Sequence, residues 1–183
     1  DGSVSYYHML LAPAVVSPRL RKAIALAPEF LTPQEGRTKQ DHELTAAKRW
    51  LHRMGERLSP HGVTLLGDDL YANQPFCLDI LEEDLNFLFV CKPKSHKWLY
   101  EWLDIHRHEG DMHTVVCSRR ENGKSRTYRY RFTNSVPIRD SEDALLVNWA
   151  DVVVTDETGK VIHHNAFITN HLIHEHNIES LIE

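Results

Sequence analysis

The sequence predicts an α/β fold in which a mixed sheet flanked by helices carries an antiparallel β-rich insertion. Helical periods and short apolar runs alternate between residues 44 and 91, which is typical of helices and buried strands. From about residue 105 the chain changes to strands separated by Gly-containing turns. With 183 residues, 42% of them hydrophobic, the chain is long enough for one domain with a packed core.

The first part of the chain predicts paired strands and then a helix. The apolar segments Val4–Leu11 and Ala23–Leu26 are typical of paired strands. After a polar stretch, Thr38 to Asp41 fits a capping box, and a helix is predicted to run to about Leu58. Its apolar period is formed by Leu44, Ala47, Leu51, Met54 and Leu58.

Two buried strands, at residues 63–66 and 86–91, are predicted on either side of a helix that begins at Pro75. This order favours parallel strands covered on both faces. The first strand ends on Asp68 and Asp69, at the strand end where open α/β sheets bind ligands. The two acids could equally cap the turn and the following helix, and the pair alone does not decide between these interpretations.

The second half predicts two hairpins. Segments 114–117 and 127–132 flank Asn122-Gly123, and segments 152–154 and 161–162 flank Glu157–Gly159. A strand at 166–169 and a helix from 174 to 182 follow. The expected division is therefore a core over 1–104, a β-rich insertion over 105–165, and a return strand with the start of a core helix over 166–183.

Composition limits the function classes. The net charge is -5, so the chain is not basic as a whole, and a surface that binds nucleic acid must be a local patch of positive charge. The three cysteines are too scattered for a disulfide framework or a CxxC metal site. No apolar run approaches the roughly 20 residues of a membrane helix, so we expect a soluble, cytoplasmic protein without membrane contact. The chain begins at Asp1 without methionine, and we interpret it as an excerpt from a longer protein.

Several short, separated segments of the sequence resemble insertion-sequence transposases of the DDE type, whose catalytic domain has an RNase H-like fold. The most specific is GDDLY-(x)4-F, which begins at Gly67, follows KQDHELTAAKRWL and precedes FLFVCKPKSHKWLYEWL. Three further segments occur along the chain in the same order as in that family. They are LAPEFLTPQEG at 26–36, VNWADV at 147–152 and HNAFITNH at 164–171. The resemblance covers nearly the whole chain and implies an RNase H-like core.

The resemblance implies that Asp68 is the second of three metal-binding carboxylates and that Asp69 shapes the turn. It implies cleavage and strand transfer of DNA phosphodiesters by two Mg²⁺ ions, with Mn²⁺ able to substitute. The partners would be transposon ends and target DNA, bound by a homodimer and associated with the nucleoid.

The other two acids of the family are not convincingly present. Asp1-Gly2 is interpreted as the turn into the second strand of the family's sheet. The glutamates Glu175, Glu179 and Glu183 lack the arginine of the family's glutamate pattern. We therefore expect that glutamate beyond Glu183, and we expect the isolated chain to be inactive.

The insertion contains the predicted DNA contacts. Alternation over 127–132 places Tyr128 and Tyr130 on one face and Arg129 and Arg131 on the other. The DNA-binding candidates of the hairpin are Arg119, Arg120, Lys124, Arg126, Arg129 and Arg131. A second group, Lys92, Lys94 and His96, follows the strand next to that of Asp68. The same arginines could simply keep the solvent face of a sheet soluble.

Other site types have less support. The HEH triplet at 174–176 lacks the i, i+4 spacing of zinc ligands on a helix, and Thr158-Gly159-Lys160 lacks the upstream glycine of a P-loop. A transposase-derived DNA-binding module without catalysis remains an alternative. An α/β domain with an unrelated binding role is another.

Overall fold

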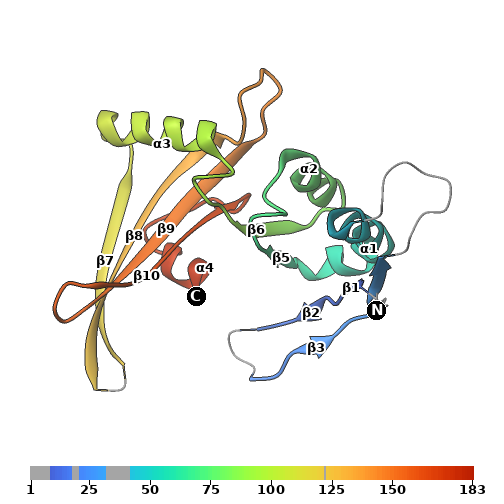
Figure 1. The fold of residues 1–183 in the computed structure, drawn as a ribbon, viewed down its shortest axis with the longest axis horizontal. Coiled ribbons are helices and arrows are strands. Elements are labelled where there is room, and N and C mark those ends of the chain that lie inside the picture. Colours follow the sequence, from blue (N-terminus) through green and yellow to red (C-terminus); the bar gives the residue numbers. More distant parts are fainter. Residues whose placement is uncertain (1–8, 18–20, 32–41, 122) are drawn as a thin grey trace, which may run out of the picture. The chain divides into compact units, whose positions relative to one another are not determined.

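The computed structural model describes residues 9–17, 21–31, 42–121 and 123–183 (Figure 1). The chain divides into two compact units, residues 1–61 and 62–183. Among the described helices, none has the length and apolar character needed to cross a bilayer.

The first unit packs one helix against short antiparallel strands. Strand β1 (Met9–Leu11) pairs with β4 (Glu29–Leu31), and β2 (Ala14–Val15) pairs with β3 (Ile24–Ala25). The two N-terminal segments predicted as strands therefore contain strands, but in the described residues they do not pair with each other. The chain doubles back through β2 and β3 before β4 returns to β1, a short-range reversal that the apolar pattern did not reveal.

Helix α1 (Glu43–Leu58) ends at the predicted residue and is followed by a 3₁₀ turn, η1 (Ser59–His61). Its N-cap is His42, whose Nδ1 accepts a hydrogen bond from the Thr45 N–H at 3.4 Å. The predicted capping box at 38–41 lies outside the described residues. One face of the helix buries Ala46, Ala47, Trp50 and Leu51.

The second unit is built on one six-stranded mixed sheet. Its elements are β5 (Thr64–Gly67), α2 (Gln74–Glu82), β6 (Asn86–Val90), α3 (Lys97–Glu109), β7 (His113–Glu121), β8 (Lys124–Pro137), β9 (Leu146–Asp156), β10 (Val161–Thr169) and α4 (Ile178–Ile182). The strand order is β5-β6-β10-β9-β8-β7, with β5 and β6 parallel and every other pair antiparallel. The predicted mixed sheet flanked by helices, with its parallel pair and two hairpins, is confirmed.

Different helices cover the two faces of this sheet (Figure 1). On the first, which we call the α4 face, Tyr130, Phe132 and Val152 pack with Ile178 of α4. On the second, the α3 face, Trp149 meets Tyr100 of α3 edge-on, with ring centroids 6.1 Å apart. Because side chains alternate along a strand, each residue of β7 to β10 is assigned to one face by its register.

Two predicted boundaries are wrong. The segments 161–162 and 166–169 are parts of the single strand β10, which pairs with β9 throughout apart from one irregularity near Val161. Helix α4 begins at Ile178 instead of His174. The His174 N–H donates to Asn177 Oδ1 at 2.8 Å, so residues 174–177 form a side-chain-closed turn before the helix.

Candidate functional site

The carboxyl ends of the parallel strands β5 and β6 lie at one edge of the sheet, and a polar turn leaves each of them. Gly67, the last residue of β5, pairs with Phe89 of β6. A Cβ atom at Gly67 would lie 2.7 Å from Tyr71 Cδ2 and 3.0 Å from Phe89 Cδ1. Only glycine lets these two rings close over the strand end, which fixes where the turn with Asp68 and Asp69 begins.

Asp68 is exposed at this edge. Its Oδ1 accepts a hydrogen bond from the Leu70 N–H at 2.9 Å, which makes an Asx-turn. Its carboxylate makes no other hydrogen bond to the described residues. Asp68 therefore closes the turn with one carboxylate oxygen, as a turn-capping residue does. It also presents carboxylate oxygen to solvent, where a cation or a proton donor can reach it.

Asp69 has a structural role across the two turns. Its carboxylate accepts hydrogen bonds from the Lys92 N–H at 2.6 Å and from the Ser95 hydroxyl. The Nε2 of His96 lies 3.4 Å from Oδ1, an electrostatic contact without hydrogen-bond geometry. The turn after β5 is thereby fixed to the turn after β6. Asp69 thus occupies the role that the sequence predicted, shaping the turn beside Asp68.

The three basic residues predicted to follow β6 do not share one environment. Lys92 and Lys94 are exposed, as phosphate contacts must be. The His96 side chain is only 10% exposed. Burial lowers the pKa of His96, although the Asp69 carboxylate opposes this effect. His96 is therefore a largely buried neighbour of Asp69 and not an exposed phosphate contact, whereas Lys92 and Lys94 are exposed at this edge.

A Mg²⁺ site needs several oxygen ligands, and the described residues do not supply them together. Among those residues no group of three His, Cys, Asp or Glu side chains converges. Asp1 lies outside the described residues. Glu179 of α4 and Glu183, which follows the helix, instead bind the Arg119 guanidinium. The described residues therefore do not form a complete two-metal site, and Asp68 is an exposed carboxylate at the ends of the parallel strands.

The basic residues of the β7–β8 hairpin are divided between the two faces of the sheet. Arg119 of β7 lies directly opposite Arg126 of β8, and both side chains are on the α4 face, as is Tyr128. The Arg119 guanidinium lies 5.0 Å from the Tyr128 ring centroid and also binds Glu179 and Glu183, so it holds the α4 end of the chain on the sheet. Sequence reasoning missed this role, because the sequence does not show that α4 returns to β7.

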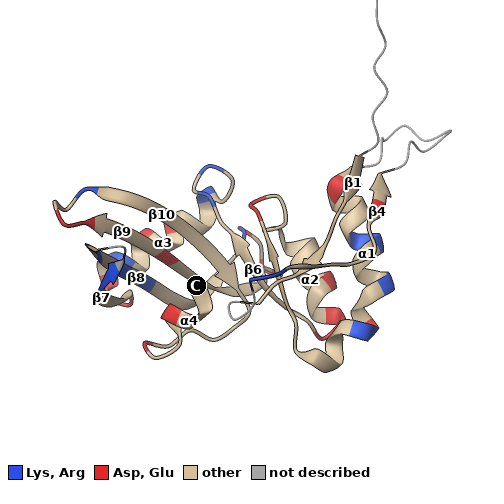
Figure 2. Ribbon diagram, turned by 90° about the horizontal axis from the view of Figure 1, so that it is seen from below, with Lys and Arg blue, Asp and Glu red and all other residues tan. Residues whose placement is uncertain are grey.

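Arg120, Arg129 and Arg131 lie on the α3 face, as the alternation over 127–132 predicts for the last two. Arg129 is exposed, and Arg120 Nε donates to the Gly123 carbonyl at 3.3 Å across the turn. Lys124 is also exposed, but its register places it on the α4 face with Arg126. Figure 2 shows Lys and Arg gathered on β7 and β8 near this hairpin. Arg120 and Arg129 are therefore the predicted phosphate contacts that stay exposed on the α3 face.

Arg131 contacts a buried carboxylate, Asp151, in a group of residues that the sequence analysis did not identify. Asp151 of β9 is 1% exposed and accepts hydrogen bonds from Arg131 Nε, at 3.0 Å, and from Arg131 Nη2. His164 Nε2 of β10 lies 3.1 Å from the same carboxylate. Three adjacent strands are thus joined by one acid. A lone aspartate within the apolar run at 147–154 was the available signal, since a buried carboxylate needs a partner.

At the ends of β5 and β6 the described residues thus present two exposed lysines, Lys92 and Lys94, and the exposed carboxylate of Asp68. No protein-family model matches the chain, and no curated protein matches it either.

Proposed function

We propose that the chain is part of the catalytic domain of a DDE-type transposase with an RNase H-like fold, which cleaves and joins DNA strands at transposon ends. The observation that carries the proposal is the position of Asp68. It follows a strand of a parallel pair, at the edge where such sheets bind ligands, and it is exposed. Asp69, next to it, is used to build the turn.

The positive charges on the described residues support DNA as the substrate. Lys92 and Lys94 follow β6 at the same edge as Asp68, and Arg129 is exposed on the α3 face. Such isolated cations suit phosphate oxygens, which carry most of the sequence-independent affinity for DNA. A chain with net charge -5 that concentrates cations locally would bind DNA through those regions.

We propose Asp68 as one Mg²⁺ ligand, with Mn²⁺ able to substitute. The remaining ligands would come from residues that the structure does not describe. The homodimer on paired DNA ends belongs to the same proposal.

A second candidate is a transposase-derived DNA-binding module without catalysis. It is favoured by the failure of the described residues to bring three metal-binding side chains together. Both candidates predict salt-dependent DNA binding, but only the first predicts cleavage that depends on Asp68.

The experiment that separates them measures duplex-DNA affinity against salt and nicking of supercoiled DNA with Mg²⁺ or Mn²⁺. It uses this chain and a version extended at both ends. Nicking by the extended protein supports the transposase. Binding without nicking supports the module, and absence of both leaves a domain with another role.

A further inference from the structure

An open pocket of ≈ 320 Å³ lies beside the turn that follows β6. It is formed by the starts of α2 and α3 and by the segment after β8. Its volume is at the lower end of the range for small-ligand sites. Ser95 and His96 line the pocket and also contact Asp69, so the pocket adjoins the strand edge that carries Asp68.

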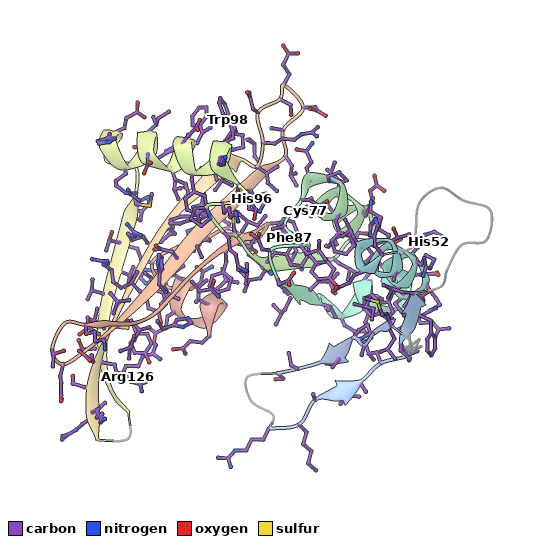
Figure 3. The ribbon with its side chains drawn as sticks, in the orientation of Figure 1. His52, Cys77, Phe87, His96, Trp98 and Arg126 are labelled. Atoms are coloured by element: carbon purple, nitrogen blue, oxygen red, sulfur yellow. The ribbon has the colours of Figure 1, made fainter. Side chains whose placement is uncertain are left out.

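The pocket presents an aromatic surface. Trp98, in the first turn of α3, lines it and is 37% exposed (Figure 3). Pro75 and Ile138 contribute further apolar wall. An indole left open to solvent beside a pocket is a platform on which a planar ring can stack, and every nucleobase offers such a ring.

Two cations lie beside this surface. Lys97 lines the pocket next to Trp98 and is exposed. Arg139 lines it from the segment after β8; it pairs with Asp143 at 2.7 Å, and its side chain is still 46% exposed. Asp140, also in the lining, disfavours a ligand of high negative charge. An aromatic ring carrying a single phosphate group matches this arrangement.

The side-chain amides of the pocket are already used. Gln74 donates to the Asp143 carbonyl and accepts from the Leu145 N–H, both at 2.8 Å. Asn73 caps α2 by accepting from the Phe76 N–H at 3.1 Å and donates to the Leu70 carbonyl at 3.0 Å. Without free amides the pocket has few groups with which to distinguish one base from another, so binding there would be tolerant of sequence.

We infer that this pocket binds an unpaired nucleotide, stacking its base on Trp98 and placing its phosphate near Lys97 and Arg139. The inference rests on the proposed function for the source of the nucleotide, a DNA strand at the Asp68 edge. A free mononucleotide has the same chemistry, and binding of dAMP alone distinguishes the two sources.

The test compares a blunt duplex with the same duplex bearing a short unpaired tail, by fluorescence anisotropy at fixed salt. The variants are Trp98→Ala, Trp98→Phe and the control Trp102→Ala, which lies one turn along α3 and does not line the pocket. Binding of dAMP alone is measured in parallel by calorimetry. Circular dichroism confirms that each variant is folded.

The expected result is tighter binding of the tailed duplex. Trp98→Ala should weaken it about 10-fold and leave the blunt duplex unchanged. Trp98→Phe should retain most of the affinity, and Trp102→Ala should behave as wild type. If no DNA binds but dAMP binds and Trp98→Ala abolishes it, the pocket takes a free nucleotide and the DNA function fails. If wild type and Trp98→Ala bind both duplexes equally and dAMP does not bind, the pocket assignment is overturned while DNA binding stands.

Discussion

The Asp69 carboxylate accepts a hydrogen bond from the Lys92 N–H at 2.6 Å, which joins the turn after β5 to the turn after β6. The two acids at the end of β5 therefore have different roles. Asp69 fixes the geometry of the edge, while Asp68 is exposed. This difference can be measured as a difference in stability.

Asp69→Ala should lower the free energy of unfolding by about 1–3 kcal/mol, because the Lys92 N–H and the Ser95 hydroxyl lose their acceptor. Asp68→Asn should change it by less than about 0.5 kcal/mol, because asparagine still accepts from the Leu70 N–H. Urea denaturation followed by circular dichroism measures both values. Equal losses in the two variants would show that Asp69 has no special structural role.

Arg131 and Arg129 lie two residues apart on the same face but should differ in their effect on stability. Arg131→Ala leaves the buried Asp151 carboxylate without its main partner, so it should lower the free energy of unfolding by about 3 kcal/mol. Arg129→Ala removes an exposed side chain and should cost less than about 0.5 kcal/mol. Thermal melts of the matched pair check this, and a small loss in Arg131→Ala would mean that His164 alone can compensate Asp151.

Stability should fall on acidification below pH about 6.5, the ordinary pKa of histidine. Burial lowers the pKa of both His96 and His171 in the folded chain. The unfolded chain therefore binds more protons between their folded values and pH about 6.5, so the free energy of unfolding decreases as pH falls through that window. Above it both forms are neutral and the two groups contribute no slope.

The measurement is denaturation at a series of pH values for wild type, His96→Gln and His171→Gln. Each variant should show a shallower decline of stability below pH about 6.5 and the same slope as wild type above it. His171 also meets the Thr64 hydroxyl at 2.9 Å, so glutamine retains a possible hydrogen-bonding group there. Unchanged slopes in both variants would contradict the assignment.

Duplex-DNA binding should depend on the α3 face and less on the α4 face. Arg129→Ala should weaken binding at all sequences and reduce the slope of log affinity against log salt by about 1. Arg119→Ala should instead lower the melting temperature, because Glu179 and Glu183 lose their partner, and should leave the salt slope unchanged. Anisotropy titrations at several salt concentrations decide this. A reduced slope in Arg119→Ala alone would move the DNA surface to the other face.

The sequence was sufficient for some local elements of the second unit, although it did not predict α3, divided β10 into two segments and began α4 at His174. The parallel pair β5 and β6, the helix between them and both hairpins follow from apolar runs, Pro75 and Asn122-Gly123, since these signals lie within a few residues of the structure they specify. The positions of Tyr128 and Arg129 on opposite faces follow from strand geometry alone.

Long-range contacts could not be read in the same way. Nothing near Arg119 in the sequence shows that it meets Glu183, 64 residues later, and nothing near Arg131 shows that it meets Asp151. The basic residues of the hairpin therefore appeared equivalent in the sequence, although Arg119 and Arg131 form ion pairs with carboxylates. At the candidate site the order of Asp68 and Asp69 was available from the sequence, but the use of Asp69 by Lys92 required the register of β5 and β6.

The most direct test of the proposed function is nicking of supercoiled DNA in Mg²⁺ or Mn²⁺ by the protein extended at both ends of this chain. Wild type is compared with Asp68→Asn and with the control Asp84→Asn, an exposed acid after α2. Wild type and Asp84→Asn should nick DNA, and Asp68→Asn should not, although its stability should be unchanged. Nicking that persists in Asp68→Asn, or its absence from all three proteins, would rule out Asp68 as a catalytic metal ligand.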